Sequence, residues 1–183
     1  MTKSRLNLGC GRDIRQGYVN IDSVALPGVD TVLNVATAPL PFADGSCDEV
    51  LCQDVLEHID YLPLLKEIHR VLAPGGRLVV RVPHYTSRNN AVDPTHCKTF
   101  SIDTFEFFLA EPEFNHALTY YTDFHFSSIS RMRITFPRGS KLLFLNRPVE
   151  RWVNANRRRM RLYELSFLSG LFPAENIETT LVR

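Results

Sequence analysis

The stretch LNLGCG at residues 6–11, followed by YVNID at residues 18–22, decides the fold of this chain. It predicts a short apolar strand that enters a glycine turn, and a second strand that ends on a carboxylate. Glycines at 9 and 11 remove side chains where the backbone must pass close to a ligand. Asp22 is placed to accept hydrogen bonds from the two vicinal hydroxyls of a ribose. We therefore expect an open α/β sheet that holds a nucleoside.

The residues after the turn distinguish between nucleoside cofactors. A dinucleotide site needs a third glycine and a full helix whose N-terminal N–H groups hold the pyrophosphate. Only residues 12–17 separate the turn from the second strand, well short of the roughly dozen residues that a parallel crossover normally uses. S-adenosylmethionine carries no phosphate, whereas the carboxylate of Asp13 would repel a pyrophosphate. The spacing favours S-adenosylmethionine over NAD.

Two longer stretches extend this pattern, PLPFADGSCDEVLCQDVLEHI at residues 39–59 and LLKEIHRVLAPGGRLVVRVP at residues 64–83. With the first two stretches, they make the chain resemble a class I S-adenosylmethionine-dependent methyltransferase of the compact kind called methyltransferase type 11. The resemblance runs from residue 6 to about residue 83. It implies an enzyme with a Rossmann-like α/β fold and S-adenosyl-L-methionine as its cofactor.

The cofactor is expected at the carboxyl ends of the first strands, where open α/β sheets bind ligands. The family usually has an acidic residue where this chain has Asn7, and commonly an Asp near the adenine where this chain has Asn34. An amide can still hydrogen-bond the edge of the adenine ring. The expected cofactor-binding residues are Asn7, Gly9, Cys10, Gly11, Asp22, Asn34, Val35, Gln53 and Asp54.

The order of strand and helix signals predicts a doubly wound, mostly parallel sheet covered on both faces, with a shortened first crossover and an antiparallel last strand. Strands are expected near residues 5–8, 18–21, 31–34, 48–52 and 77–82, within 119–136, and at 176–182. Helices are expected near 54–59, 62–72 and 101–110, with a loop at 84–100. A helical cap insertion is expected over 138–173, with helices at 148–163 and 164–170.

Composition fits one domain over residues 1–183, because 44% hydrophobic residues in a chain of this length bury one sizeable core. The net charge of +1 gives no bulk attraction to nucleic acid or to a membrane surface. The sequence contains no apolar run long enough for a membrane span and no leader. Its four cysteines lack CxxC spacing and indicate reduced thiols in a cytoplasmic protein. Only the adjacent His96 and Cys97 stand close together among the histidines and cysteines, so no metal is expected.

Methyl transfer from a sulfonium is an in-line displacement, so alignment and desolvation can supply much of the rate. A general base matters mainly for a hydroxyl or a protonated amine. The candidate catalytic residues are His84, Tyr85 and His96, which follow the fifth strand. Each histidine could instead be a structural donor, and Asp54 could cap the helix after it. Glu57 and His58 are expected to decorate that helix.

Six arginines make the expected insertion basic: Arg147, Arg151, Arg157, Arg158, Arg159 and Arg161. They are either a solvated helix face or a docking surface for an anionic acceptor such as a phosphorylated glycan. Aromatic residues are sparse there, which disfavours single-stranded nucleic acid.

We expect methyl transfer to an oxygen or nitrogen atom of a small-molecule or glycan-like acceptor. The alternative is a non-catalytic protein of the same fold that binds a nucleoside or a partner, with an NAD-dependent oxidoreductase a distant third. The insertion or a partner subunit is expected to cover the site, so an oligomer remains an option.

Overall fold

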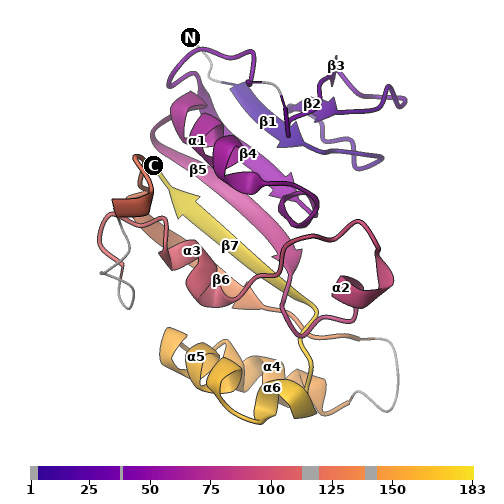
Figure 1. Cartoon of the computed structure of the whole chain (residues 1–183), viewed down its shortest axis with the longest axis vertical. Helices are drawn as coiled ribbons and strands as arrows, with labels where there is room; N and C mark the ends of the chain where they lie inside the picture. The colour runs from indigo at the N-terminus through magenta and orange to yellow at the C-terminus, as the bar shows by residue number, and fades with distance from the viewer. Residues whose placement is uncertain (1–3, 38, 113–119, 139–143) are drawn as a thin grey trace.

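The computed structural model of the chain describes residues 4–37, 39–112, 120–138 and 144–183. Its strands form a single seven-stranded sheet in the order β3-β2-β1-β4-β5-β7-β6 (Figure 1). The five strands from β1 to β5 pair in parallel, whereas β7 runs antiparallel to β5 and to β6. The strands are β1 Ser4–Leu8, β2 Val19–Asp22, β3 Thr31–Val32, β4 Cys47–Gln53, β5 Leu72–Pro83, β6 Ser128–Ile134 and β7 Asn176–Val182. The predicted mixed sheet with an antiparallel last strand is confirmed.

The strand order reverses beside β1, which is the switch point of a doubly wound sheet. The β1–β2 connection at residues 9–18 contains no helix, whereas its length allowed about one helical turn. Leu6 pairs with Val19 and Leu8 pairs with Ile21, so both strands end at the same edge. The carboxyl ends of β1, β2 and β4 therefore lie side by side.

The helical segments are η1 Leu56–His58, α1 Tyr61–Val71, α2 Asn89–Val92, α3 Ile102–Glu106, α4 Asn146–Val153, α5 Arg157–Leu165 and α6 Leu168–Leu171. The helix that connects β4 and β5 is α1, which buries Leu64, Leu65, Ile68 and Val71 at the expected helical spacing. Three differences are local: η1 is a single 3-10 turn, α3 is shorter than the predicted aromatic helix, and α2 interrupts the predicted loop.

One face of the sheet is buried and the other is half-exposed. Along β5, the side chains of Leu78, Val80 and Val82 are fully buried, whereas Arg77 is exposed and Arg81 is partly exposed. Figure 1 shows α1 and α3 on the same side of the sheet. The prediction of cover on both faces is therefore wrong for the described part of the chain, because the connections between β1, β2, β3 and β4 there hold no α-helix.

The segment between β6 and β7 contains α4, α5 and α6, which pack at the β6 edge of the sheet (Figure 1). The prediction of one helix over residues 148–163 is wrong, because the helical conformation is interrupted between Val153, where α4 ends, and Arg157, where α5 begins. The side chain of Asn154 exchanges hydrogen bonds with the backbone of Ile134, 2.8 Å from its N and 2.7 Å from its O. Asn156 then caps α5 by accepting from the Arg159 N–H at 3.0 Å.

A single hydrophobic cluster runs through the sheet and these helices, from Leu6 to Leu181, and includes Met160 and Tyr163 of α5. No helix among the described residues is both long enough and apolar enough to cross a membrane.

Candidate cofactor and acceptor site

The loops that follow β1, β2 and β3 meet at the carboxyl edge of the sheet. The N–H of Cys10 donates to the carbonyl oxygen of Ile21 at 3.0 Å, and the N–H of Leu33 donates to that of Asp22 at 2.8 Å. These backbone bonds extend the parallel pairing by one step beyond each strand. They place the expected cofactor residues of three separate segments next to one another.

The glycine turn has the backbone conformation that its sequence predicted. Gly9 and Gly11 have φ angles of 59° and 51°, in the left-handed region that other residues rarely adopt. A side chain at Gly9 would collide with Val55, whereas one at Gly11 would meet no protein atom within 4 Å. The turn is therefore closed toward the protein at Gly9 and open at Gly11, where a ligand can approach the backbone.

Asp22 is fixed against this turn. One carboxylate oxygen accepts from the Gly11 N–H at 2.8 Å, and the other accepts from the Val24 N–H at 2.9 Å. Each carboxylate oxygen has a second lone-pair site, and the side chain stays partly exposed at the end of β2. This arrangement fits a ribose diol beside the open side of Gly11.

Asn7 lies under the turn. Its side chain is buried, and its amide nitrogen donates to the carbonyl oxygen of Asp13 at 2.7 Å and to Oδ1 of Asn20 at 3.1 Å. Cys10 is also buried, and burial raises the pKa of its thiol. Both residues hold the shape of the turn from within, because a buried amide must have its hydrogen bonds satisfied.

The remaining expected cofactor residues stand at the same edge. Asn34 is exposed, and its Oδ1 accepts from the Ala36 N–H at 3.0 Å, which leaves the amide NH₂ free to donate. Val35 is partly buried and packs on the hydrophobic core. Gln53 is the last residue of β4 and is partly exposed.

Asp54 does not cap the helix after it. Its φ angle is 56°, the N-cap position of η1 is Val55, and the Asp54 carboxylate instead binds the guanidinium of Arg81 on β5. The Asp54 N–H also donates to the carbonyl oxygen of Arg81 at 2.8 Å. The pair ties the ends of β4 and β5 together, because two parallel N–H bonds to one carboxylate fix its orientation.

A cavity of about 390 Å³ opens at the carboxyl ends of β4 and β5. The lining residues are Asp54, Glu57, His58, Arg81, Pro83, Asn89, Val92, Asp93, His96 and Asn176. None of them comes from α4, α5 or α6, so the helices of the expected cap do not line this cavity. It lies next to the glycine turn along the sheet edge, on the β4 side.

Two of the three candidate catalytic residues face away from this cavity. The side chain of His84 is fully buried; its Nδ1 accepts from the Thr86 N–H at 3.1 Å, and its Nε2 therefore donates to Oε1 of Glu164 at 3.0 Å. The Tyr85 hydroxyl donates to the carbonyl oxygen of Glu164 at 2.9 Å. These contacts fit anchoring of α5, because no free lone pair is left on His84.

Residues 6–80 match the family model described as a methyltransferase domain. The matched segment contains the glycine turn, Asp22 and Asp54, and it ends within β5, one residue before Arg81. Over these residues the chain is similar to methyltransferases, and its sheet shares the fold of an S-adenosylmethionine-dependent methyltransferase.

The chain has a curated relative, an uncharacterized protein of Methanocaldococcus jannaschii, that is 54% identical over 43 residues. Those residues are 24% of this chain and 19% of the relative, so the match spans about a fifth of that protein.

Two solved structures share the fold of this chain. A SAM dependent methyltransferase from Archaeoglobus fulgidus superposes with a TM-score of 0.65 at 17% identity, covering 99% of this chain and 86% of that one. Phosphoethanolamine N-methyltransferase 2 of Haemonchus contortus, in complex with S-adenosyl-L-methionine, gives a TM-score of 0.57 at 18% identity, covering 100% of this chain and 49% of that one. At such identities the likeness shows the fold alone.

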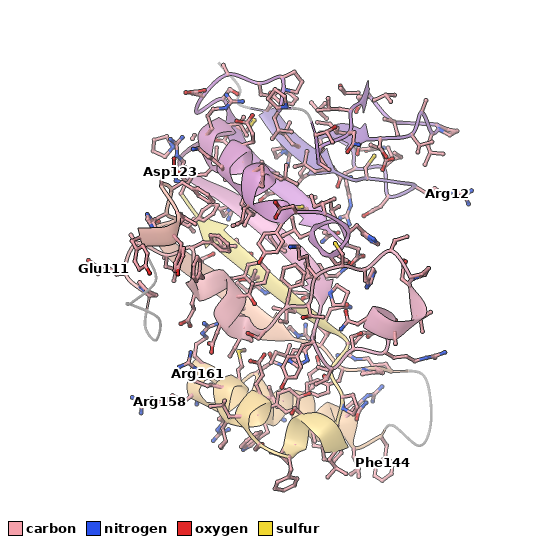
Figure 2. All side chains as sticks on the ribbon, viewed as in Figure 1. Arg12, Glu111, Asp123, Phe144, Arg158 and Arg161 are labelled. Atoms are coloured by element: carbon pink, nitrogen blue, oxygen red, sulfur yellow. The ribbon has the colours of Figure 1, made fainter. Side chains whose placement is uncertain are left out.

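Three of the six arginines that were expected to make the helical insertion basic have partners among the described residues. Arg157 binds Glu106, and Arg161 lies 2.5 Å from the carboxylate of Asp103, so both attach α5 to α3. Arg159 stacks over the ring of Trp152. Arg158 extends from the outer side of α5 (Figure 2). Fewer arginines are therefore available to an anionic ligand than expected, because Arg157 and Arg161 form ion pairs within the chain.

The structure also places two residues that the sequence did not assign to the site. Glu57 is 1% exposed, and burial raises its pKa to about 7, so it does not decorate a helix surface as predicted. His58 lines the cavity beside it, and the ring centroid of His96 lies 4.7 Å from that of His58. The signal in the sequence is the adjacent carboxylate and imidazole in VLEHI directly after a buried strand.

Proposed function

We propose that the protein transfers a methyl group from S-adenosylmethionine to an oxygen or nitrogen atom of a small-molecule acceptor. The observation that carries this proposal is the contact between Asp22 and the Gly11 N–H at 2.8 Å, beside an open cavity at the ends of β4 and β5. The turn held by Asp22 would bind the nucleoside, and the cavity leaves room for an acceptor next to it.

The residues at the carboxyl edge of the sheet would each bind a different part of the cofactor. Asp22 accepts from the ribose hydroxyls, and the exposed NH₂ of Asn34 donates to the adenine edge. Gly11 lets the methionine part approach the backbone, and Gln53 borders the point where donor and acceptor meet. S-adenosylmethionine, when bound, supplies an activated methyl carbon, so the protein mainly has to align the acceptor and exclude water.

Among the predicted catalytic residues, the cavity contact of His96 makes it the one that we retain as a candidate. Its ring lines the cavity, and its side chain is only 8% exposed. His84 and Tyr85 are assigned to positioning of α5, because their polar atoms contact Thr86 and Glu164.

The charge of the cavity bears on the acceptor. Three carboxylates, those of Asp54, Glu57 and Asp93, line it together with a single guanidinium, that of Arg81. An acidic lining disfavours an anionic group in the cavity itself. We therefore favour the neutral, hydroxyl-rich part of a glycan-like acceptor, or an amine, at the methylated atom.

An anionic part of such an acceptor would have to bind elsewhere. A second hollow, of about 470 Å³, lies between β6 and α4. Arg147 and Arg151 are exposed there, beside two further arginines that bind Glu150. This hollow is the remaining basic surface on which a phosphate group could dock.

We propose that the whole chain acts as one domain, because one continuous hydrophobic cluster runs from Leu6 to Leu181 through the described residues. Helices α4 to α6 then form a wall at the β6 edge. Cytoplasmic location fits four free cysteines, of which Cys10, Cys47 and Cys52 are buried. The half-exposed sheet face leaves room for a partner subunit, and nucleic acid remains a disfavoured acceptor.

Calorimetry with S-adenosylmethionine, S-adenosylhomocysteine and NAD tests the cofactor. We expect the first two to bind with one site per chain and NAD not to bind. Transfer of a labelled methyl group to pools of polyols, glycans and amines then tests the reaction. Cofactor binding without transfer to any pool would favour the non-catalytic alternative, and failure of both sulfur nucleosides to bind would overturn the proposal.

A further inference from the structure

Glu57, His58 and His96 converge in the acceptor cavity. One ligand atom from each of these side chains lies within 4.8 Å of the other two. Glu57 and His58 belong to η1, whereas His96 comes from the loop after α2. The carbonyl oxygen of Glu57 accepts from the N–H groups of Cys97 and Lys98, at 2.8 and 3.1 Å. These backbone bonds hold the loop of His96 against η1.

The hydrogen bonds around His58 fix the position of its proton. The hydroxyl of Thr95 donates to Oδ1 of Asp93 at 2.6 Å, so its oxygen must accept from Nδ1 of His58, 2.8 Å away. In the neutral imidazole, a proton on Nδ1 leaves a lone pair on Nε2. His58 is therefore oriented by an Asp93–Thr95 relay, as metal-binding histidines are by their outer partners.

His96 offers a lone pair from the other side. Its Nδ1 is buried without a hydrogen-bond partner among the described residues. Its Nε2 lies 3.7 Å from Oδ2 of Asp93, on the opposite side of the ring. A proton on Nε2 then faces the carboxylate of Asp93. The lone pair of Nδ1 is left without a hydrogen-bond donor among the described residues.

Glu57 completes the set with a buried carboxylate. Its side chain is 1% exposed, and its Oε2 likewise finds no partner in the described part of the chain. Leaving a buried carboxylate oxygen and a buried ring nitrogen without partners destabilises the folded chain. Two such atoms in one cavity indicate a group that the protein alone does not supply.

A cation that accepts electron pairs would satisfy both atoms. Both unsatisfied atoms carry lone pairs, and the cavity has three carboxylates against one guanidinium, which Asp54 already binds. A carboxylate and two imidazoles suit a divalent first-row transition metal, whereas Mg²⁺ and Ca²⁺ prefer oxygen ligands.

We propose that Glu57, His58 and His96 bind one Zn²⁺ ion, through a carboxylate oxygen, Nε2 and Nδ1 respectively. Ligand atoms on a tetrahedral zinc ion lie about 3.3 Å apart. The ligand atoms lie within 4.8 Å of one another, so side-chain rotations would have to bring them closer by up to about 1.5 Å. Three protein ligands leave a fourth position open, as in zinc sites that bind a substrate.

That open position faces the proposed acceptor cavity. Resting on the proposed function, we infer that the ion holds an oxygen atom of the acceptor there, which accounts for an acidic cavity in an enzyme that takes hydroxyl-rich substrates. The metal site itself depends only on the three side chains and their partners. It can therefore be tested without an acceptor.

Titration of the metal-free full-length protein with Zn²⁺ by calorimetry tests the site, and Co²⁺ absorption reports its ligands. We expect one ion per chain and a tetrahedral Co²⁺ spectrum without a thiolate charge-transfer band. His96→Ala, His58→Ala and Glu57→Gln should each weaken Zn²⁺ binding at least about a hundredfold. Thr95→Val, which removes only the support of His58, should weaken binding about tenfold to a hundredfold.

Two controls separate this site from adventitious binding. Cys97 is exposed and next to His96, and His125 lies outside the cavity. Cys97→Ser and His125→Gln should keep the affinity within about threefold. Unchanged Zn²⁺ affinity in folded His96→Ala and Thr95→Val, or a loss in Cys97→Ser alone, would overturn the proposal, and circular dichroism verifies that each variant is folded.

S-adenosylmethionine binding is measured in the same samples. Zinc binding without methyl transfer would contradict only the proposed function. Methyl transfer that survives chelation, in a chain that binds no stoichiometric Zn²⁺, would contradict only this inference.

Discussion

Gly9 and Asp22 belong to the same turn of the proposed cofactor site, although 13 positions separate them in the chain. Gly9 has a φ angle of 59° and faces Val55, so both backbone conformation and space exclude a side chain there. Asp22 fixes the far side of the same turn through the Gly11 N–H. Stability and ligand affinity are therefore set by different residues of one turn.

Gly9→Ala should lower the free energy of unfolding by about 2–4 kcal/mol. The alanine would have to adopt a left-handed backbone conformation, and its methyl group would also collide with the side chain of Val55. Adding Val55→Ala to Gly9→Ala should remove the collision but not the backbone strain, so the double variant should recover only part of the lost stability. Urea unfolding of the two single variants and the double variant measures both contributions. Equal stability of Gly9→Ala and the unmodified chain would contradict this account of the turn.

Asp22→Ala should weaken S-adenosylmethionine binding by about 1.5–3 kcal/mol, the range for hydrogen bonds to a charged group. Calorimetry measures the change. Asp123→Ala is the matched control, because Asp123 is exposed and pairs with Lys66 away from the turn. If both variants bind alike, Asp22 does not hold the ribose.

At the level of elements, α5 is joined to β5 and α3 by one buried carboxylate. Oε1 of Glu164 accepts from Nε2 of His84 and from the Ile102 N–H, each at 3.0 Å. The same helix brings Arg161 to Asp103. The insertion is therefore fixed to the sheet by polar contacts as well as by the buried rings of Tyr163 and Phe136, whose centroids lie 5.4 Å apart.

Glu164→Ala should destabilise the protein by about 2–5 kcal/mol, because it leaves a buried ring N–H and a buried backbone N–H without acceptors. Methyl-transfer kcat should stay within about tenfold, since His84 faces away from the cavity. Thermal unfolding and steady-state kinetics at a temperature where the variant is folded test both statements. A fall in kcat of about 10²–10⁴ with unchanged stability would instead restore His84 as a general base.

Across the whole molecule, a histidine links α1 to the chain that leads into β6. Nε2 of His69 donates to the carbonyl oxygen of His125 at 3.1 Å, and its ring packs on Phe124 and Phe126. Burial, and then the charge of Arg183, lowers the pKa of His69. Folding therefore favours its neutral form.

Because the folded pKa of His69 lies below its unfolded value of about 6.5, the unfolded chain binds the proton more readily. The contribution of His69 to stability is thus complete above pH 6.5 and declines as the pH falls through that value toward the folded pKa. Urea unfolding between pH 8 and pH 5 should show a steeper loss in the unmodified protein than in His69→Gln. Parallel curves for the two proteins would contradict the lowered pKa.

The sequence by itself determined the order of the elements and the glycine turn, and it predicted Asp22 as the ribose carboxylate and S-adenosylmethionine as the cofactor, because these inferences depend on residues that are near one another in the chain. Local spacing also predicted α1 and β7 closely. It did not predict the break at Asn154, because that side chain is satisfied by Ile134 on β6, 20 residues away.

The tertiary structure decided which polar residues reach the cavity. His84 follows β5 directly, yet Nε2 of its ring is hydrogen-bonded to the carboxylate of Glu164, 80 positions later in the chain. Glu57 and His96 are 39 positions apart in the sequence and meet only because the backbone of Glu57 binds the loop at Cys97. Long-range hydrogen bonds set these pairings, and no local propensity encodes which distant partner satisfies a buried polar atom.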